Sequence, residues 1–181
     1  MKIYFLLLCC ILPTASVHAE QICKPDSIPA STPDSQLVDN GDGTVTDSAT
    51  GLMWKKCLEG LSGNNCGDGF EDSFTWQQAL QKPDAVNNSG GFAGYRDWRL
   101  PNINELVSLV EEQCSLPAIN LNLFPNTPSW YVWSGSPHAH NSIAWSVNFL
   151  DGTSEGYSRN IRHPAVRLVR AAGIEQSRNC F

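Results

Sequence analysis

Hydrophobic and polar residues alternate along much of the last third of the chain, a pattern typical of strands with one buried face. The clearest case is "SIAWSVNF", whose apolar positions are Ile143, Trp145, Val147 and Phe149. Asp151-Gly152 follows it and favours a tight turn that returns the chain through "TSEGYS" as a hairpin. Segments 130–134 and 165–170 predict two further strands, and we expect the second to close the sheet.

A different spacing, with apolar residues three or four positions apart, predicts two helices in the middle of the chain. Thr75 can cap the first, with Gln78 placed to complete a capping box, and we expect Pro83 to stop or kink this helix. Asn102 and Glu105 form the same box at the start of a second helix, predicted over residues 103–112. Its apolar stripe consists of Ile103, Leu106, Val107 and Val110.

Turn residues divide the segment before the helices into short strands. "NGDG" at 40–43 supplies residues that adopt positive φ, and Gly51 ends the turn "SATG", so a hairpin and a further strand are predicted. Calcium binding at "DNGDGTVTD" is the alternative, but Asp39, Asp42 and Asp47 miss the spacing of a calcium loop. Two early helices and a late meander of strands predict an α+β domain with an antiparallel sheet.

The first residues form a short apolar run that predicts export. Lys2 precedes "IYFLLLCCIL", and Val17 and Ala19 occupy the small-residue positions before a cleavage point, so residues 1–19 predict a secretory signal peptide. The alternative, a membrane helix, needs about 20 apolar residues. We therefore expect an exported protein, periplasmic or extracellular, with residues 20–36 as an extended leader that contains three prolines.

The part of the chain beyond the signal is acidic. Lys2 is the only charged residue of the signal, so 11 of the 12 basic residues remain against 18 acidic ones, a net charge of −7. Such a balance excludes a general attraction to nucleic acid, and a polyanion could bind only through a local basic patch. Because no second apolar run of spanning length occurs, we expect no membrane span after removal of the signal.

Five cysteines lie beyond the signal, namely Cys23, Cys57, Cys66, Cys114 and Cys180. Export favours disulfides, and the sequence has no C-x2-C pair of the kind that binds zinc. Cys57 and Cys66 bracket the loop "LEGLSGNN", whose glycines and asparagines let its ends meet, so they are predicted to form a bridge. Because five is odd, one thiol is left over, and we expect it to be Cys180.

The stretch "GYRDWRLPNINEL", residues 94–106, concentrates charged and aromatic residues directly before the second helix. Pro101 holds Leu100 extended, so this segment delivers the helix to the core. We interpret the group as a structural clasp, in which Asp97 pairs with an arginine or bonds backbone donors while Trp98 packs inward. The group consists of Arg96, Asp97, Trp98 and Arg99. Direct contact with a ligand is the alternative.

No constellation of catalytic residues is recognisable in the sequence. The serines lack a nucleophile-elbow motif, no glycine-rich phosphate loop occurs, and the scattered carboxylates define no glycosidase pair. His138 and His140 could offer two imidazoles to a metal, but no third ligand lies nearby and "SGSPHAHNS" predicts an exposed loop. We expect no metal and no cofactor, and we keep both histidines as candidate ligand-binding residues.

Aromatic and basic residues in the last third are the other candidates for ligand contact. Trp130, Tyr131 and Trp133 share a short strand, and we expect both tryptophans in the core. Tyr131 is then expected on the opposite, exposed side, as a stacking surface for a sugar ring. A basic cluster follows, consisting of Arg159, Arg162, His163, Arg167 and Arg170. It forms either a solvated face or a patch for an anionic glycan.

Several stretches, in order, resemble the Lcl C-terminal domain family: "DGTVTDSATGLMW", "TWQQAL", "GGFAGYRDWRLPNINEL", "PAINLNLFPNTPSWYVWS", "AWSVNF" and "VRLVR". The resemblance spans residues 37–171 and leaves residues 172–181 as a tail. The family is named for the C-terminal domain of a bacterial collagen-like adhesin that binds sulfated glycans. The resemblance therefore implies an adhesin-like binding module, although the acidity of this chain argues against polyanions as its ligands.

"WRLPNINEL" is also similar to the "RLPTEAEW" element of formylglycine-generating enzymes, which leads into a core helix of a C-type-lectin-like fold. This similarity implies the same architecture here, an antiparallel sheet with two helices, but it carries no chemistry. The paired redox cysteines of those enzymes have no counterpart, since Cys180 is single.

Relatives within the Lcl C-terminal domain family imply a second bridge, Cys23–Cys114. Altogether we expect an exported, non-enzymatic module that binds carbohydrate or another extracellular or envelope partner. The alternatives are an enzyme of the formylglycine-generating-like group, which requires a deep pocket with perturbed pKa values, and a structural envelope subunit, which requires a large exposed apolar patch.

Overall fold

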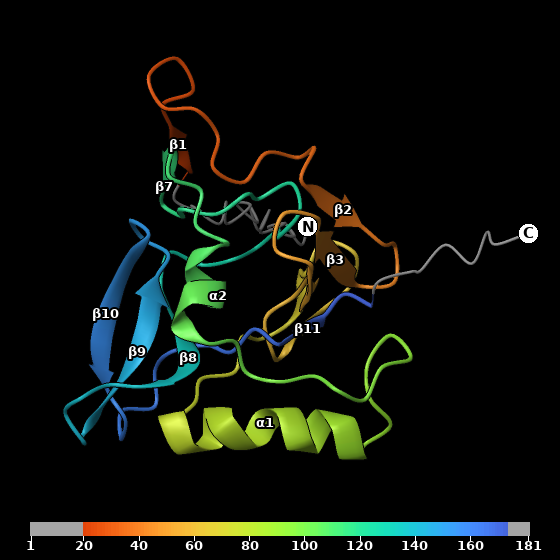
Figure 1. Cartoon of the computed structure of the whole chain (residues 1–181), viewed down its shortest axis with the longest axis vertical. Helices are drawn as coiled ribbons and strands as arrows, with labels where there is room; N and C mark the ends of the chain where they lie inside the picture. The colour runs from red at the N-terminus through yellow and green to blue at the C-terminus, as the bar shows by residue number, and fades with distance from the viewer. Residues whose placement is uncertain (1–19, 174–181) are drawn as a thin grey trace, which may run out of the picture.

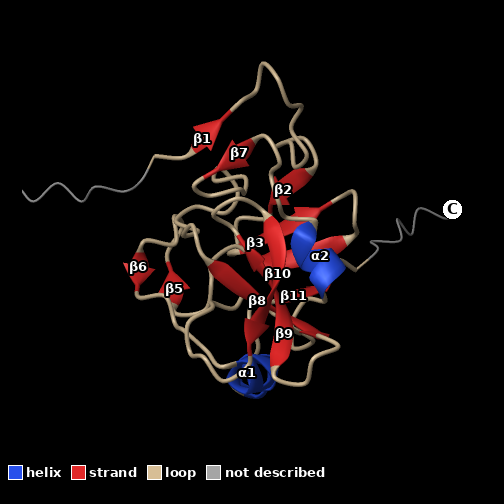
Figure 2. Ribbon diagram, turned by 90° about the vertical axis from the view of Figure 1, so that its left-hand side faces the viewer, coloured by secondary structure: helices blue, strands red, loops and turns tan. Residues whose placement is uncertain are grey.

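Two antiparallel sheets carry most of the fold, with two short helices and two small strand pairs beside them (Figure 1, Figure 2). The computed structural model describes residues 20–173. The signal peptide predicted at residues 1–19 and Cys180 lie outside the described residues. The arrangement of helices and antiparallel strands is of the predicted α+β class.

The first sheet has four strands in the order β11-β4-β3-β2. Their bounds are Leu37–Asp39 for β2, Thr44–Asp47 for β3, Leu52–Lys55 for β4 and Val169–Ala171 for β11. The hairpin predicted at 40–43 joins β2 to β3, and Gly51, with φ of 67°, turns the chain into β4. Both predicted turns are therefore confirmed, and Gly51 is placed where a side chain would strain the backbone.

The second sheet has three strands in the order β10-β9-β8. Their bounds are Tyr131–Pro137 for β8, Ile143–Asn148 for β9 and Thr153–Ser158 for β10. The hairpin predicted at Asp151-Gly152 joins β9 to β10, with Gly152 at φ of 83°. β8 extends beyond its predicted end because its pairing with β9 resumes at Pro137 after a register shift.

The prediction that residues 165–170 close this sheet is wrong. Ala165 makes a single bridge to Val132 of β8, whereas Val169 pairs with Trp54 in the other sheet. Residues 165–170 are all buried, and their apolar members contribute to both hydrophobic cores. The segment passes between the two sheets, so it has no solvent face to produce alternate exposure.

Helix α1 (Trp76–Asn88) begins as predicted, with Thr75 and Gln78 completing a capping box. Of the two expected effects of Pro83, a stop is wrong, because the helix continues through it to Asn88. The helix continues because its last turn is fastened elsewhere: the Asn87 amide donates to the Trp98 carbonyl at 2.8 Å and accepts from the Trp98 N–H at 3.1 Å. These two bonds help to offset the one that proline removes.

Helix α2 (Ile103–Val107) also begins at its predicted capping box, formed by Asn102 and Glu105. The prediction that it runs to residue 112 is wrong. Val110 instead bridges Ile119, and the Glu111 N–H donates to the Ala118 carbonyl. Pairing with a distant segment therefore replaces the last predicted turns of the helix.

Two hydrophobic cores lie between these elements. α2 packs on β8 and β9, and α1 contacts β8 across one end of the molecule (Figure 1). The remaining strands form two short pairs, β1 (Ile22–Cys23) with β7 (Cys114–Ser115) and β5 (Leu61–Ser62) with β6 (Asp68–Gly69). Within residues 20–173, neither helix has the length and apolar character to cross a membrane.

Candidate functional site

Three surface segments meet beside the start of β8 and form an open cleft of about 510 Å³. It is lined by Glu71, Ser73, Pro128, Ser129, Trp130, Arg162 and His163. Backbone bonds hold the segments in place: the Phe74 N–H donates to the Pro164 carbonyl at 3.1 Å, and the Phe149 N–H donates to the Trp130 carbonyl at 2.8 Å. The segments that line the cleft are therefore fixed to the rest of the domain by backbone hydrogen bonds.

Trp130 supplies the apolar wall of the cleft. Its ring centroid lies 4.6 Å from that of His163 and 5.4 Å from that of Tyr131, which meets it edge-on. The prediction that Trp130 is a core residue is wrong, because 38% of its surface is exposed, while Trp133 is fully buried as expected. Trp130 precedes the first residue of β8, where no second layer covers it. An indole held by two rings and open to solvent can stack on a ligand.

Glu71 is half-buried at the inner side of the cleft. Burial raises the pKa of its carboxyl group, and the positive charges of His163 and Arg167 oppose this rise. Glu71, Pro128 and Ser129 also line a second cavity, of about 640 Å³. The two cavities therefore adjoin, and we call them together the groove.

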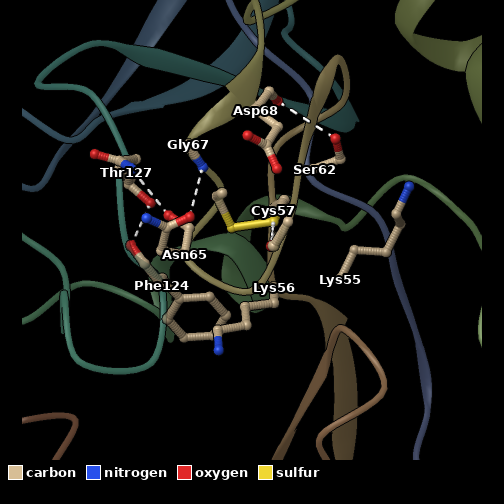
Figure 3. Close-up of a disulfide and its surroundings, with 12 residues drawn as sticks. Lys55, Lys56, Cys57, Ser62, Asn65, Gly67, Asp68, Phe124 and Thr127 are labelled. Carbon is tan, nitrogen blue, oxygen red and sulfur yellow. Dashed lines mark hydrogen bonds between the residues drawn. A yellow bond between two sulfur atoms is a disulfide. The ribbon is translucent and has the colours of Figure 1, made fainter.

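The second cavity of the groove is lined by Cys66, which forms the disulfide with Cys57 that Figure 3 shows. The Cα atoms of this bridge lie 5.3 Å apart, so the predicted bond is confirmed. Beside it, the Asn126 amide donates to the Asn65 carbonyl at 2.9 Å. This bond joins the disulfide loop to the segment that carries Thr127, which lines the same cavity.

Arg167 lies fully buried near the groove without lining it. Its guanidinium donates to the carbonyls of Lys55 and Lys56 and, at 2.8 Å, to the Thr127 hydroxyl. Its Nε has no hydrogen-bond partner within the described residues. Burial lowers the pKa of Arg167 to about 9, and the charge of Glu71 opposes this fall.

Tyr131 does not lie opposite both tryptophans, and this prediction is corrected. Side chains on a strand alternate, so residues two apart, such as Tyr131 and Trp133, share a face. Both rings lie near Tyr157, with centroids 4.6 Å and 5.8 Å away. The Tyr131 hydroxyl donates to Glu155 at 3.1 Å, and the ring contacts Trp130. Tyr131 therefore borders the cleft through Trp130 without lining it.

His138 and His140 lie at the opposite end of the second sheet. They belong to the connection from β8 to β9, whereas the cleft is at the start of β8. The His138 ring packs 4.8 Å from Trp145, and His140 Nδ1 lies 2.9 Å from the Ser142 hydroxyl. Over residues 20–173, no three histidine, cysteine, aspartate or glutamate side chains gather in a geometry that could hold a metal ion.

The predicted basic cluster is dispersed in the structure. Arg162 and His163 line the cleft, but Arg159 stacks 4.3 Å over the Trp76 ring near the start of α1 and donates to the Ile143 carbonyl. Arg167 and Arg170 are buried, so the expectation of a single solvated or anion-binding face is wrong. The reason is the path of residues 165–170 between the two sheets.

Two of the four residues of the proposed clasp, Asp97 and Arg99, form ion pairs with residues outside it. The Arg170 guanidinium donates to Asp97 at 2.8 Å and thereby lowers the pKa of that carboxyl group. Arg99 binds Glu105 through two bonds, of 2.6 and 2.7 Å, at the cap of α2. Trp98 is buried, whereas Arg96 is exposed. None of the four lines the groove, and the clasp stays our interpretation of these contacts.

The second predicted bridge, Cys23–Cys114, is also confirmed. It fastens β1 to β7 and so ties the leader to the segment that follows α2. The prediction of a free Cys180 lies outside the described residues.

Sequence reasoning missed Glu71 as a site residue. It stands in "GFEDSF" beside Asp72, and nothing in that stretch distinguishes the acid that faces the cleft from the one that does not. Trp130 was recognised as an aromatic of interest but assigned to the core. Glu71 and Trp130 could have been recognised as site residues only from knowing which distant segments meet in the fold. The pattern of residues along the chain does not contain that information.

The chain matches the model of the Lcl C-terminal domain family over residues 43–170. This range contains both helices and all three segments of the cleft. Comparison with curated proteins gives no significant match. Because the match covers well over half of its length, the chain belongs to the Lcl C-terminal domain family.

Proposed function

We propose that this protein is an exported, non-enzymatic binding module with an adhesin-like role, and that it binds a carbohydrate chain in the groove. The observation that carries the proposal is the exposed indole of Trp130 beside polar groups of Glu71 and Arg162. A sugar ring offers an apolar face for stacking and a rim of hydroxyls for hydrogen bonds, and this combination suits such a site. The two disulfides are consistent with export.

Binding without hydrolysis is favoured by the charges of the groove. Glycosidases in general use two carboxyl groups that flank the scissile bond. Glu71 is the sole carboxylate among the described residues that line either cavity. An oligosaccharide incubated with the protein is therefore expected to be recovered intact.

A C-type-lectin-like architecture is part of the proposal. It is supported by the similarity of "WRLPNINEL" to the corresponding element of formylglycine-generating enzymes and by the place of that stretch directly at α2. Fold similarity alone carries no activity, so the site bears the functional argument.

The test is a glycan array probed with the purified protein, followed by titration of any bound oligosaccharide against wild type and Trp130→Ala. Loss of a central aromatic contact typically costs tenfold or more in affinity, so the variant is expected to bind at least about tenfold more weakly. Val107→Ala is the control, because Val107 is similarly exposed, at 40%, but lies on α2 outside the groove.

Absence of array binding at micromolar protein would refute carbohydrate recognition and leave an envelope protein as the partner to seek. Equal affinities of wild type and Trp130→Ala would show that a bound glycan occupies another surface.

A further inference from the structure

Glu71 differs from the other carboxylates that are withdrawn from solvent. Four others are buried or half-buried within residues 20–173, and each accepts bonds from protein donors: Asp47, Glu59, Glu105 and Glu111. Glu71 makes no hydrogen bond and no ion pair with any described residue. A partly desolvated carboxylate without a donor is unfavourable in the free protein, so a ligand that supplies donors gains a strong contact there.

None of the positive groups near Glu71 forms an ion pair or hydrogen bond with it among the described residues. Arg167 donates to two backbone carbonyls and to Thr127. Arg162 uses its Nε to bond the Ser73 carbonyl at 2.8 Å, and the His163 ring packs against Trp130. The charges of His163 and Arg167 act on Glu71 from a distance and oppose the effect of its burial. The groove therefore keeps a negative acceptor at the junction of its two cavities.

This charge discriminates between classes of carbohydrate. A sulfate ester placed beside Glu71 would bring a second negative charge into a partly desolvated site, where like charges repel most strongly. A sugar hydroxyl at the same place donates a hydrogen bond to the carboxylate. Trp130, which lines the same cleft, accepts the apolar face of either kind of sugar.

We infer that the groove selects an uncharged oligosaccharide, with hydroxyls of one sugar unit donating to Glu71 and a neighbouring unit stacked on Trp130, and that it discriminates against the sulfated form of the same chain. This inference rests on the carbohydrate binding proposed above and names its ligand class. Since Glu71 lines both cavities, the chain lies across their junction and places sugar units on both sides.

The test uses matched pairs of uncharged and sulfated polysaccharide, namely dextran with dextran sulfate and xylan with xylan polysulfate. Tryptophan fluorescence and calorimetry measure the affinity of the purified protein for each. The uncharged member of a pair is expected to bind at least about tenfold more tightly. Its hydroxyls donate a charge-assisted hydrogen bond to Glu71, whereas the sulfate groups of the other member are repelled by the carboxylate.

Glu71→Gln is expected to weaken binding of the uncharged member about tenfold and to narrow the difference within the pair, because the amide accepts weakly and carries no charge. Glu112→Gln removes an equal charge from an exposed residue outside the groove. It is expected to change neither the affinity for the uncharged member nor the difference in affinity within the pair. Circular dichroism of both variants confirms that they are folded.

Two results would overturn the inference while leaving carbohydrate binding intact. One is tighter or equal binding of the sulfated member that still depends on Trp130, and the other is unchanged affinity for the uncharged member in Glu71→Gln. Absence of Trp130-dependent binding to every polysaccharide would refute the proposed function, and the inference with it.

Discussion

Arg167 holds a position that few charged residues occupy, since its side chain is fully buried and no carboxylate pairs with it among the described residues. Three acceptors and the Phe124 ring, 4.8 Å from the guanidinium, surround it. The planar fork of the guanidinium reaches acceptors from different segments at once. Arg167 therefore joins the end of β4 to the segment beside the groove.

We predict that Arg167→Lys destabilises the fold by about 2–4 kcal/mol, because a lysine ammonium cannot reach all three acceptors and stays buried as a charge. Urea unfolding monitored by tryptophan fluorescence measures the change. Arg96→Lys, at an exposed position, is the matched control and is expected to change stability by less than about 0.5 kcal/mol. Equal stabilities of the two variants would contradict the bridging role of Arg167.

At the scale of elements, one buried carboxylate helps to hold the leader, together with the Cys23–Cys114 bridge. Glu111 accepts bonds from the backbone N–H groups of Ser31 and Thr32, both at 2.9 Å, and from the Thr32 hydroxyl. Burial acts to raise the pKa of Glu111, but these bonds, together with one from the Gln113 N–H, outweigh it and lower the pKa below its ordinary value of 4.5. The ionised form therefore stabilises the docked leader.

We predict that Glu111→Gln costs about 1–3 kcal/mol at pH 7, since an amide replaces a charged acceptor that meets several donors. A lowered pKa in the folded state contributes stability above 4.5 that disappears as the pH falls through the folded value. The difference between wild type and variant is thus expected to shrink below pH 4.5. Urea unfolding of wild type and variant between roughly pH 3 and pH 7 measures this difference in stability. If the difference did not depend on pH, the ionised carboxylate could not be its source. Glu112→Gln is the control.

The elements also show what a sequence can predict. Both helix starts were correct, because a capping box is a contact among residues three apart. A stop at Pro83 and an end near residue 112 were wrong, because Asn87 binds Trp98 and Val110 bridges Ile119, and such contacts leave no local trace. Turns at glycines with positive φ were predicted correctly for the same local reason.

At the scale of the whole molecule, two disulfides close loops of very different length. Cys57 and Cys66 are 9 residues apart, whereas Cys23 and Cys114 are 91 apart. On a chain-entropy argument the shorter loop contributes about 2–3 kcal/mol and the longer about 4–5 kcal/mol. The two bridges therefore restrict the unfolded chain on different scales.

We predict that Cys23→Ser/Cys114→Ser lowers the free energy of unfolding more than Cys57→Ser/Cys66→Ser does, by about 1–2 kcal/mol. Only the second pair is expected to weaken ligand binding as well, because Cys66 lines the groove. Chemical unfolding and titration of the same samples separate these effects. If removal of the Cys57–Cys66 bridge lowered the free energy of unfolding more, loop length would not decide how much each bridge stabilises the fold.

The groove could not be predicted as a whole, although parts of it could. The family, the α+β class and the Cys57–Cys66 bridge follow from local patterns and ordered motifs, and the Cys23–Cys114 bridge follows from the resemblance to the family. The groove, by contrast, joins segments near residues 71, 128 and 162. Arg167 and Arg170 illustrate the limit, since arginines in an acidic chain suggested a surface, whereas both side chains are buried. Burial of a charge depends on tertiary acceptors that no spacing rule reveals.

The path of residues 165–170 from one sheet to the other also bears on the order in which the molecule can form. Both cores require this segment, since Ala165 and Val169 complete one and Val166 and Leu168 the other. It is also the last of the described strands to be synthesised or exported. A chain halted before residue 165 would hold two open sheets and no smaller finished unit. We therefore expect the groove to assemble only after almost the entire domain has been synthesised.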